Sequence, residues 1–216
     1  AYVEKQRMEE TLKLAHDIQM SMVPKIFPPF PDRSEFDIFA TLAPAKEVGG
    51  DFYDFFFIDD DHLCFAVGDV SGKGVPASLF MAVTKTLFRA TASNGGTPGE
   101  ILARLNAEIC RDNESCMFVT LFCAILNIRT GQVDYSNGGH NLPYYLHQRG
   151  VSPLENLGGR VLGLVEQSPY ASGRMVLGRG EALLLYTDGV TEAMDSRERL
   201  YSDQRLAEFL ASNRGS

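Results

Sequence analysis

The feature of this sequence that most constrains its fold is an apolar run that ends in an aspartate and a glycine-rich turn. Residues 63–70 are typical of a buried strand, and Asp69 stands near the end of that strand. Residues 71–74 form the turn, and Pro76 suits the first turn of a following helix, where its missing N–H would be unpaired anyway. An ionised carboxylate beside so apolar a run is costly unless something positive or hydrogen-bonding meets it. We therefore expect Asp69 to face a bound cation whose other ligands lie elsewhere in the chain.

Composition excludes several classes of protein. The 216 residues are 44% hydrophobic and include 14 Phe, enough for the core of one large domain or two small ones. The net charge of −8 argues against a nucleic-acid-binding surface, so no nucleic-acid partner is expected. No apolar run approaches the ~18 residues of a membrane span. The 4 cysteines show no C-x-x-C pairing, which predicts reduced core thiols in a cytoplasmic protein.

Residues 2–22 have the apolar spacing of a helix, which should stop before Pro24 because a residue that precedes proline is pushed out of the helical region. The chain begins at Ala1 without a signal-peptide pattern, so we expect an upstream part that is absent here. We divide the chain into a linker or regulatory helix, residues 1–23, and a globular domain, residues 24–216. The helix either packs on its own domain or forms a coiled coil with a second copy. One stripe contains Met8, Leu12, Ala15, Gln19 and Met22, and a second contains Leu14 and Ile18.

The rest of the pattern predicts blocks of strands and helices. Residues 149–173 lack periodicity and predict an irregular surface insertion, and the three acids at 59–61 predict a solvated hairpin turn. Blocks, in place of strict alternation, favour an α+β fold with two sheets packed face to face and a helix pair on an outer face. Strands are expected over residues 36–42, 51–58, 63–70, 118–128, 132–136, 144–147 and 181–187, and helices over residues 75–92, 97–110 and 206–210.

Aspartate stands beside glycine at three predicted strand ends, in Gly50-Asp51, Gly68-Asp69 and Asp188-Gly189. Carboxylates gathered at one end of a sheet repel each other unless a cation holds them. Hard oxygen ligands without neighbouring His or Cys favour Mg²⁺ or Mn²⁺ over Zn²⁺. Two such ions can share a bridging carboxylate, bind a phosphate and lower the pKa of a water. Asp-Gly pairs also mark ordinary turns, so the spacing alone leaves both interpretations open.

Several longer motifs resemble one family, the SpoIIE/RsbU-type branch of the metal-dependent PPM protein phosphatases. The motifs that carry the resemblance span residues 44–54 (PAKEVGGDFYD), 68–77 (GDVSGKGVPA), 117–122 (MFVTLF), 137–141 (NGGHN) and 185–192 (LYTDGVTE). The resemblance extends from about Gln19 to Tyr201. It implies a PPM-type α/β-sandwich of two packed, mainly antiparallel sheets flanked by helices.

The resemblance also implies the roles of individual residues. Asp69 would bridge two Mn²⁺ or Mg²⁺ ions, with the Val70 backbone carbonyl as a further ligand. Asp51 would serve the second metal, directly or through water, and Asp188 the first. The implied reaction is in-line attack of water on a phosphoserine or phosphothreonine, without a phosphoenzyme. These three aspartates are the predicted catalytic residues.

Two neighbours of this set, Asp54 and Gly72, are not expected to be ligands. In a regular strand Asp54 points to the other face from Asp51. His140 either lines the site or fixes its own turn. Lys73 is a candidate phosphate contact, against the interpretation that it is a solvated turn lysine.

The chain departs from the family pattern at its end. The family's last motif, an Asp-Asp followed by a Thr on a final strand, is expected beyond Ser216. The C-terminal end of the family fold is therefore expected to be missing. Either the chain is cut or disordered there, or its metal affinity is weakened.

Two rival phosphate chemistries fail on the sequence. Residues 123–129 have the C-x₅-R spacing of cysteine phosphatases, but they lie in a predicted strand and not in a phosphate-binding loop. Residues 68–74 lack the Ser or Thr with which a P-loop holds Mg²⁺.

The predicted function is therefore a metal-dependent serine/threonine protein phosphatase, the output domain of a bacterial signalling protein. The resemblance implies a small phosphorylated regulatory protein, such as an anti-anti-sigma factor, as its substrate. We expect a cytoplasmic domain, controlled by an absent upstream sensor through homodimerisation of helix 2–22, with anchoring of the parent protein to the inner membrane left open. The alternative is a catalytically weak or inactive phosphatase-like module that binds a phosphorylated partner or relays a signal.

Overall fold

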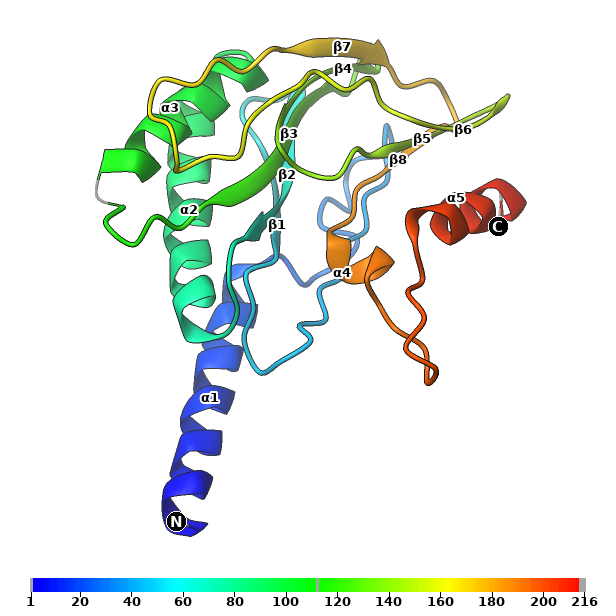
Figure 1. Cartoon of the computed structure of the whole chain (residues 1–216). Coiled ribbons are helices and arrows are strands. Elements are labelled where there is room, and N and C mark those ends of the chain that lie inside the picture. Colours follow the sequence, from blue (N-terminus) through cyan, green and yellow to red (C-terminus); the bar gives the residue numbers. More distant parts are fainter. Residues whose placement is uncertain (1, 112, 214–216) are drawn as a thin grey trace.

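The structure, a computed structural model, describes residues 2–111 and 113–213 (Figure 1). Helix α1 (Tyr2–Met22) precedes a long connector and the hairpin β1 (Phe52–Phe57) and β2 (His62–Val70). Helices α2 (Val75–Ser93) and α3 (Pro98–Arg111) follow, and then the hairpin β3 (Val119–Asn127) and β4 (Gln132–Gly138). The remaining elements are β5 (Tyr144–His147), β6 (Gly150–Pro153), β7 (Gly173–Val176), β8 (Ala182–Leu184), α4 (Asp188–Thr191) and α5 (Asp203–Ser212).

The strands form two antiparallel sheets. The larger has the order β1-β2-β3-β4-β7 and the smaller the order β6-β5-β8. Figure 1 shows α2 and α3 on one side of the larger sheet and the smaller sheet on its other side. The predicted α+β sandwich of two packed antiparallel sheets with flanking helices is confirmed.

Both faces of the larger sheet are buried, and they form two apolar cores. On β2, Cys64, Ala66 and Val70 join the core beneath α2 and α3, whereas Leu63 joins the core between the two sheets. Successive side chains of a strand point to opposite faces, so β2 contributes to both cores. Burial on both faces explains why these strands are near-continuous apolar runs in the sequence. All four cysteines are free, two of them buried.

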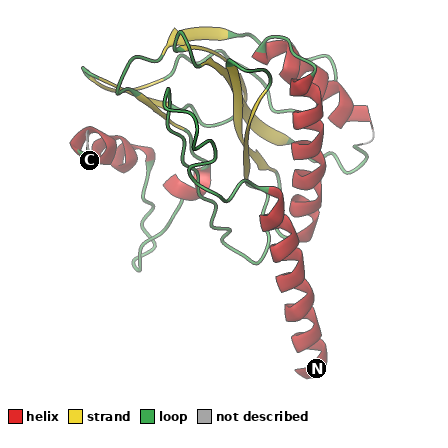
Figure 2. Ribbon diagram, turned by 180° about the vertical axis from the view of Figure 1, so that it is seen from behind, coloured by secondary structure: helices red, strands yellow, loops and turns green. Residues whose placement is uncertain are grey.

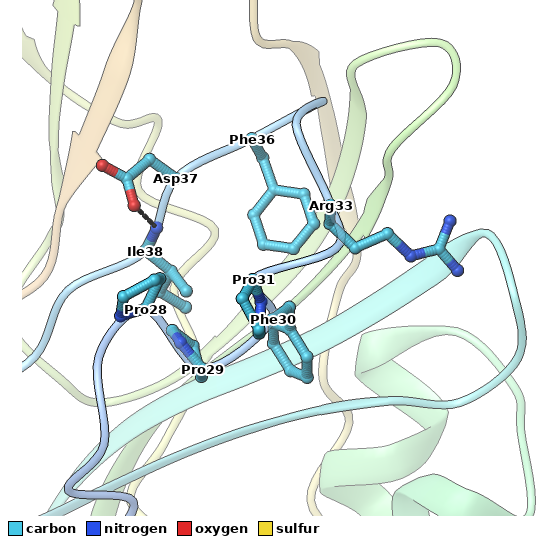
Figure 3. A pocket seen from close by; sticks show the side chains of 8 residues that line it. All are labelled: Pro28, Pro29, Phe30, Pro31, Arg33, Phe36, Asp37 and Ile38. Carbon is cyan, nitrogen blue, oxygen red and sulfur yellow. Dashed lines mark hydrogen bonds between the residues drawn. The ribbon is translucent and has the colours of Figure 1, made fainter.

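The strand predicted over residues 36–42 is wrong. These residues are irregular, and the connector packs on β1 through Phe30 and Phe36, whose rings lie 4.9 and 6.0 Å from that of Phe57. The Ile38 N–H donates to the Asp37 carboxylate at 2.8 Å, so a local side chain takes the place of a strand partner. Figure 3 shows the hollow of about 100 Å³ that results, lined by Pro28, Pro29, Phe30, Pro31, Arg33, Phe36, Asp37 and Ile38.

The irregular surface insertion predicted over residues 149–173 is only partly correct: residues 154–172 are irregular, but residues 150–153 form β6 and part of the segment enters the core. Leu162 is fully buried, and its backbone pairs in both directions with that of Val119. The buried Asn106 amide on α3 donates to the carbonyls of Val165 and Glu166, each at 2.8 Å. A segment without periodicity can enter the core when a side chain satisfies its backbone in this way.

Helix α1 packs on the domain only along its C-terminal half, and its N-terminal half extends away from the domain in both views (Figures 1 and 2). Its one buried residue among those described is Gln19. The Gln19 amide donates to the Gly49 carbonyl at 2.6 Å and accepts from the Gly49 N–H at 3.1 Å. The large apolar side chains of α1 that stay exposed are Tyr2, Val3, Met8, Leu14 and Ile18.

None of the helices in the described ranges combines the length and apolar character needed to cross a bilayer.

Candidate metal centre

Two of the predicted aspartates form a pair at one end of the larger sheet. Asp69 lies on β2 directly opposite Thr120 of β3, and Phe52 of β1 lies opposite Gly68. Asp51 is the residue before Phe52, and its carboxyl is hydrogen-bonded to that of Asp69. Asp51, Asp69 and Thr120 therefore form a row across three neighbouring strands.

Glycine allows the segment before Asp51 to approach β2 closely. A Cβ atom on Gly50 would lie 2.5 Å from the Val70 carbonyl oxygen, a distance that no side chain could tolerate. The Val70 N–H in turn donates to the Gly50 carbonyl at 3.3 Å. This close approach brings Asp51 alongside Asp69 and leaves the Val70 carbonyl at the same end of the sheet.

The segment that leaves β8 meets this row. β8 ends at Leu184, earlier than the predicted 187, because the chain turns toward Asp51 and starts α4 at Asp188. The Thr187 hydroxyl donates to Asp51 Oδ2 at 3.0 Å. A Cβ atom on Gly189 would lie 3.6 Å from the same oxygen, so the Asp188–Gly189 backbone passes beside Asp51.

The electrostatics of the row are those of crowded acids. Burial raises the pKa of Asp69 to about 7, and the charge of Asp51, its hydrogen bond, and the charges of Asp188 and Glu192 add to the rise. Burial also raises the pKa of Asp51 and the charge of Asp188 adds to the rise, against lowering hydrogen bonds from Asp69 and Thr187. A divalent cation would offset the repulsion that contributes to both raised pKa values.

Within residues 2–111 and 113–213, no three His, Cys, Asp or Glu side chains lie close enough together to hold a metal as they stand. The repulsion from Asp188 extends over a longer range than metal coordination, which needs oxygens at about 2.0–2.6 Å from one ion. Asp51 and Asp69 are thus the assembled part of the site, and Asp188 lies outside it. The donors, carboxylates and the Val70 carbonyl, are of the hard oxygen type that Mg²⁺ and Mn²⁺ prefer, so the residues fit such ions.

Asp54 lies on the opposite face of β1, as strand alternation predicts. Its fully buried carboxyl accepts hydrogen bonds from Lys85 Nζ at 2.9 Å and from Arg89 Nε and Nη2 at 2.9 and 2.6 Å, all on α2. This ion pair anchors α2 to β1 and has no part in the acidic row.

His140 is buried, and it joins two parts of the site. Its Nε2 lies 3.1 Å from the Tyr186 carbonyl and its Nδ1 lies 2.8 Å from the Thr120 hydroxyl. The Asn137 side chain holds the His140 backbone from both sides, at 2.7 and 2.9 Å. His140 therefore both fixes its own turn and borders the acidic row.

The sequence analysis missed three residues of this region: Thr120, Thr187 and Glu192. Each lies inside a motif quoted above, but their roles depend on contacts between distant segments. Lys73 is exposed on the turn after β2. Asp59 accepts hydrogen bonds from the Asp61 and His62 N–H groups, which agrees with the hairpin turn predicted at residues 59–61. Residues 123–127 lie within strand β3, so the C-x₅-R spacing does not form the phosphate-binding loop of a cysteine phosphatase.

The antiparallel two-sheet sandwich and the acidic row at its end define a PPM-type, or PP2C-like, phosphatase domain. The sequence profile described as Stage II sporulation protein E (SpoIIE) matches residues 59–216, and the chain belongs to this family.

Comparison with individual proteins agrees with this assignment. The chain is 30% identical to Protein IcfG of Synechocystis sp., over 94% of this chain and 36% of that protein. It is also 30% identical to Phosphoserine phosphatase RsbU of Bacillus subtilis, over 87% of this chain and 55% of that protein. The SiaA-PP2C domain of Pseudomonas aeruginosa shares the fold, with a TM-score of 0.80, 21% identity and coverage of 98% of this chain and 84% of that one. The chain thus spans about a third to a half of the length of these two curated relatives.

The environment of His140 predicts a pH dependence of folding stability. Burial lowers the pKa of His140 from 6.5 to about 4, although the hydrogen bond that Nε2 donates to the Tyr186 carbonyl acts to raise it. As the pH falls, the unfolded chain therefore protonates this histidine at about pH 6.5, whereas the folded chain protonates it only at about pH 4. Stability from this group is complete above pH 6.5 and falls by about 3 kcal/mol as the pH drops to 4. Urea unfolding across this range should show a shallower loss in His140→Gln, whereas parallel curves would contradict the expectation.

Proposed function

We propose that this domain is a metal-dependent serine/threonine protein phosphatase that hydrolyses phosphoserine or phosphothreonine on a regulatory protein. The observation that carries the proposal is the acidic row, in which Asp51 lies against the half-buried Asp69 beside the Val70 carbonyl, and burial together with the Asp51 charge raises the pKa of Asp69. Membership of the SpoIIE family supports the same activity, and the similar RsbU is named a phosphoserine phosphatase.

The proposed cofactors are two Mn²⁺ or Mg²⁺ ions. Asp69 would contact both, the Val70 carbonyl and Asp188 would complete the first site, and Asp51 would serve the second. When bound, such ions neutralise phosphate charge and lower the pKa of a water. Thr187 orients Asp51 through its hydrogen bond to Oδ2. Lys73, exposed on the turn after β2, is the proposed phosphate contact.

A second candidate function is a phosphatase-like module that binds a phosphorylated partner without turnover. It is favoured by the position of Asp188 outside the assembled pair, since within the described ranges no three acids form a ready metal site. The two candidates differ in whether metal produces hydrolysis.

Hydrolysis of p-nitrophenyl phosphate and of a phosphoserine peptide tests the proposal. We expect turnover with Mn²⁺, loss of turnover in EDTA and recovery on adding excess Mn²⁺. The assay should include a longer piece of the protein that extends past residue 216, where the sequence pattern expects a further acidic motif. Absence of turnover in both pieces, with a phosphorylated partner still bound, would favour the binding module.

We propose a small phosphorylated regulatory protein, of the anti-anti-sigma type, as the substrate, and a cytoplasmic location for the domain. Pull-down with an Asp69→Asn variant, followed by mapping of phosphorylated sites, would identify the partner. The expected result is a phosphoprotein that is retained by the variant and dephosphorylated by the wild type.

We further propose that α1 connects the domain to an upstream sensor and forms a homodimer. Leu14 and Ile18 stay 61% and 57% exposed although they form an apolar stripe. Pairing of two copies along this stripe would bury it.

Sedimentation analysis tests the dimer. The wild type is expected to dimerise, whereas Leu14→Lys combined with Ile18→Lys should be monomeric, because two like charges would meet across the interface. Glu9→Lys, an exposed position on the opposite face of the same helix, is the matched control and should still dimerise. A wild type that stays monomeric at high concentration would contradict the proposal.

A further inference from the structure

A single buried imidazole connects the strand that pairs with Asp69 to the segment that carries Asp188. Thr120, directly opposite Asp69 on the neighbouring strand, contacts His140 Nδ1 at 2.8 Å. Tyr186, two residues before Asp188, contacts His140 Nε2 through its carbonyl at 3.1 Å. One contact therefore lies on the larger sheet and the other on the segment that leaves the smaller sheet.

The chemistry of the partners defines the direction of both hydrogen bonds. A carbonyl can only accept, so His140 Nε2 carries the proton and donates to Tyr186. In a neutral imidazole Nδ1 must then accept, and Thr120 is its donor. The Thr120 hydroxyl also lies 3.4 Å from the Asp69 carbonyl, which places it between His140 and the backbone of the acidic row.

The ring cannot shift without losing other contacts. The Asn137 amide accepts from the His140 N–H and donates to its carbonyl, and both residues are buried, at 5% and 6% exposed. The imidazole is planar and rigid, so it holds Thr120 and Tyr186 at a set separation. The second polar link between these segments, Thr187 to Asp51, lies next in sequence to Tyr186.

We infer that His140 is a positioning residue, which sets the separation of Asp69 from Asp188 by joining Thr120 to Tyr186, and this inference rests on the proposed function. It touches neither the phosphate nor the proposed ions. It acts by holding the backbone near the two acids in position. Substitution of residues that orient metal ligands in this way typically weakens metal affinity about 10- to 100-fold.

Two substitutions separate the two hydrogen bonds. His140→Asn keeps an acceptor near Thr120 and loses the reach to Tyr186, and His140→Gln keeps a donor toward Tyr186 and loses the acceptor. Thr120→Val removes the hydroxyl at nearly constant volume. Ser136→Ala is the matched control. Ser136 is fully buried and its hydroxyl donates to the Ala171 carbonyl at 2.7 Å, a contact that does not involve the acidic row.

Calorimetric titration with Mn²⁺ alone measures the effect without catalysis. We expect about 10-fold or weaker Mn²⁺ binding in both His140 variants and in Thr120→Val, and unchanged binding in Ser136→Ala. Thermal unfolding without metal, run in parallel, shows whether each variant is folded. If the His140 variants do not fold, Thr120→Val carries the test.

The outcomes separate this inference from the proposed function. Unchanged Mn²⁺ affinity in folded variants would overturn the role of His140 and leave the phosphatase proposal standing. A wild type that binds no Mn²⁺ would overturn both. Nitrogen NMR of the metal-free wild type is a further test, since a proton on Nδ1 in place of Nε2 would overturn the inference.

Discussion

Replacing Asp69 with Asn is expected to abolish metal-dependent phosphatase activity and to stabilise the metal-free protein. Asp69 is the acid that both proposed ions would share, so its loss should lower kcat/KM by about 10³-fold or more, the upper range for removing one electrostatic group from an active site. Assays of p-nitrophenyl phosphate hydrolysis at saturating Mn²⁺ measure this loss. Activity within tenfold (about one order of magnitude) of the wild type would contradict the assigned role.

The stabilisation follows from the pKa of Asp69. Burial and the neighbouring acids raise this pKa from 3.8 to about 7 in the folded protein, so the folded state holds a proton that the unfolded chain releases. The stability contributed by this proton is complete below pH 3.8 and is lost as the pH rises through 7. Asn carries no charge and avoids this loss. Allowing for solvent screening at a partly exposed group, we expect a gain of about 1–2 kcal/mol at pH 8.

Urea unfolding in EDTA measures this gain. The difference between Asp69→Asn and the wild type should be present at pH 8 and should shrink at pH 4.5, where the wild-type carboxyl is protonated in the fold. Added Mn²⁺ should reverse the order, because only the wild type binds it tightly. A variant that is less stable than the wild type at pH 8 in EDTA would show that the acids do not repel one another.

Replacing Asp54 with Asn is expected to destabilise the fold strongly. The Lys85 ammonium is 8% exposed and would be left buried without its anion. Removing one partner of a buried ion pair costs about 3–5 kcal/mol, because the other charge stays uncompensated. For a chain of this size, that loss corresponds to a fall in Tm of about 10 °C. Urea and thermal unfolding measure the two quantities.

Two controls separate this ion pair from surface electrostatics. Asp134→Asn breaks an exposed pair with Arg174, at 2.6 Å, and should cost less than about 1 kcal/mol. Asp54→Leu combined with Lys85→Met removes both buried charges and should recover much of the loss. Mn²⁺ affinity should be unchanged in folded Asp54 variants. A fall equal to that of Asp69→Asn would mean that Asp54 is a metal ligand after all.

The sequence was sufficient for the class of fold because its signals are local. The turn and proline after Asp69 predict the start of α2, and the short hairpin turn at residues 59–61 aligns β1 with β2, which places Asp51 beside Asp69. Asp54 could be assigned to the other face from strand alternation alone. These inferences need only neighbouring residues and one strand pairing.

The remaining features depend on contacts between distant segments, and no local pattern encodes them. The hydrogen bond from Thr187 to Asp51 joins residues 136 positions apart, and that from Asn106 to Val165 joins residues 59 apart. The second of these draws an aperiodic segment into the core, which is why the predicted surface insertion was only partly correct. Motif similarity identified the regions of Thr120 and Thr187 but not the partners of those residues.

The two hydrogen bonds between the Gln19 amide and the Gly49 peptide couple α1 to the acidic row. Gly49 lies two residues before Asp51, and Gln19 lies on a helix that reaches well beyond the rest of the molecule. A rotation of that helix by one residue, about 100°, would turn the amide away and break both hydrogen bonds at once. Torque applied at the N-terminal end of α1 would thus release the Gly49 peptide in one step and free the neighbouring Asp51 to move, without any ligand entering the domain.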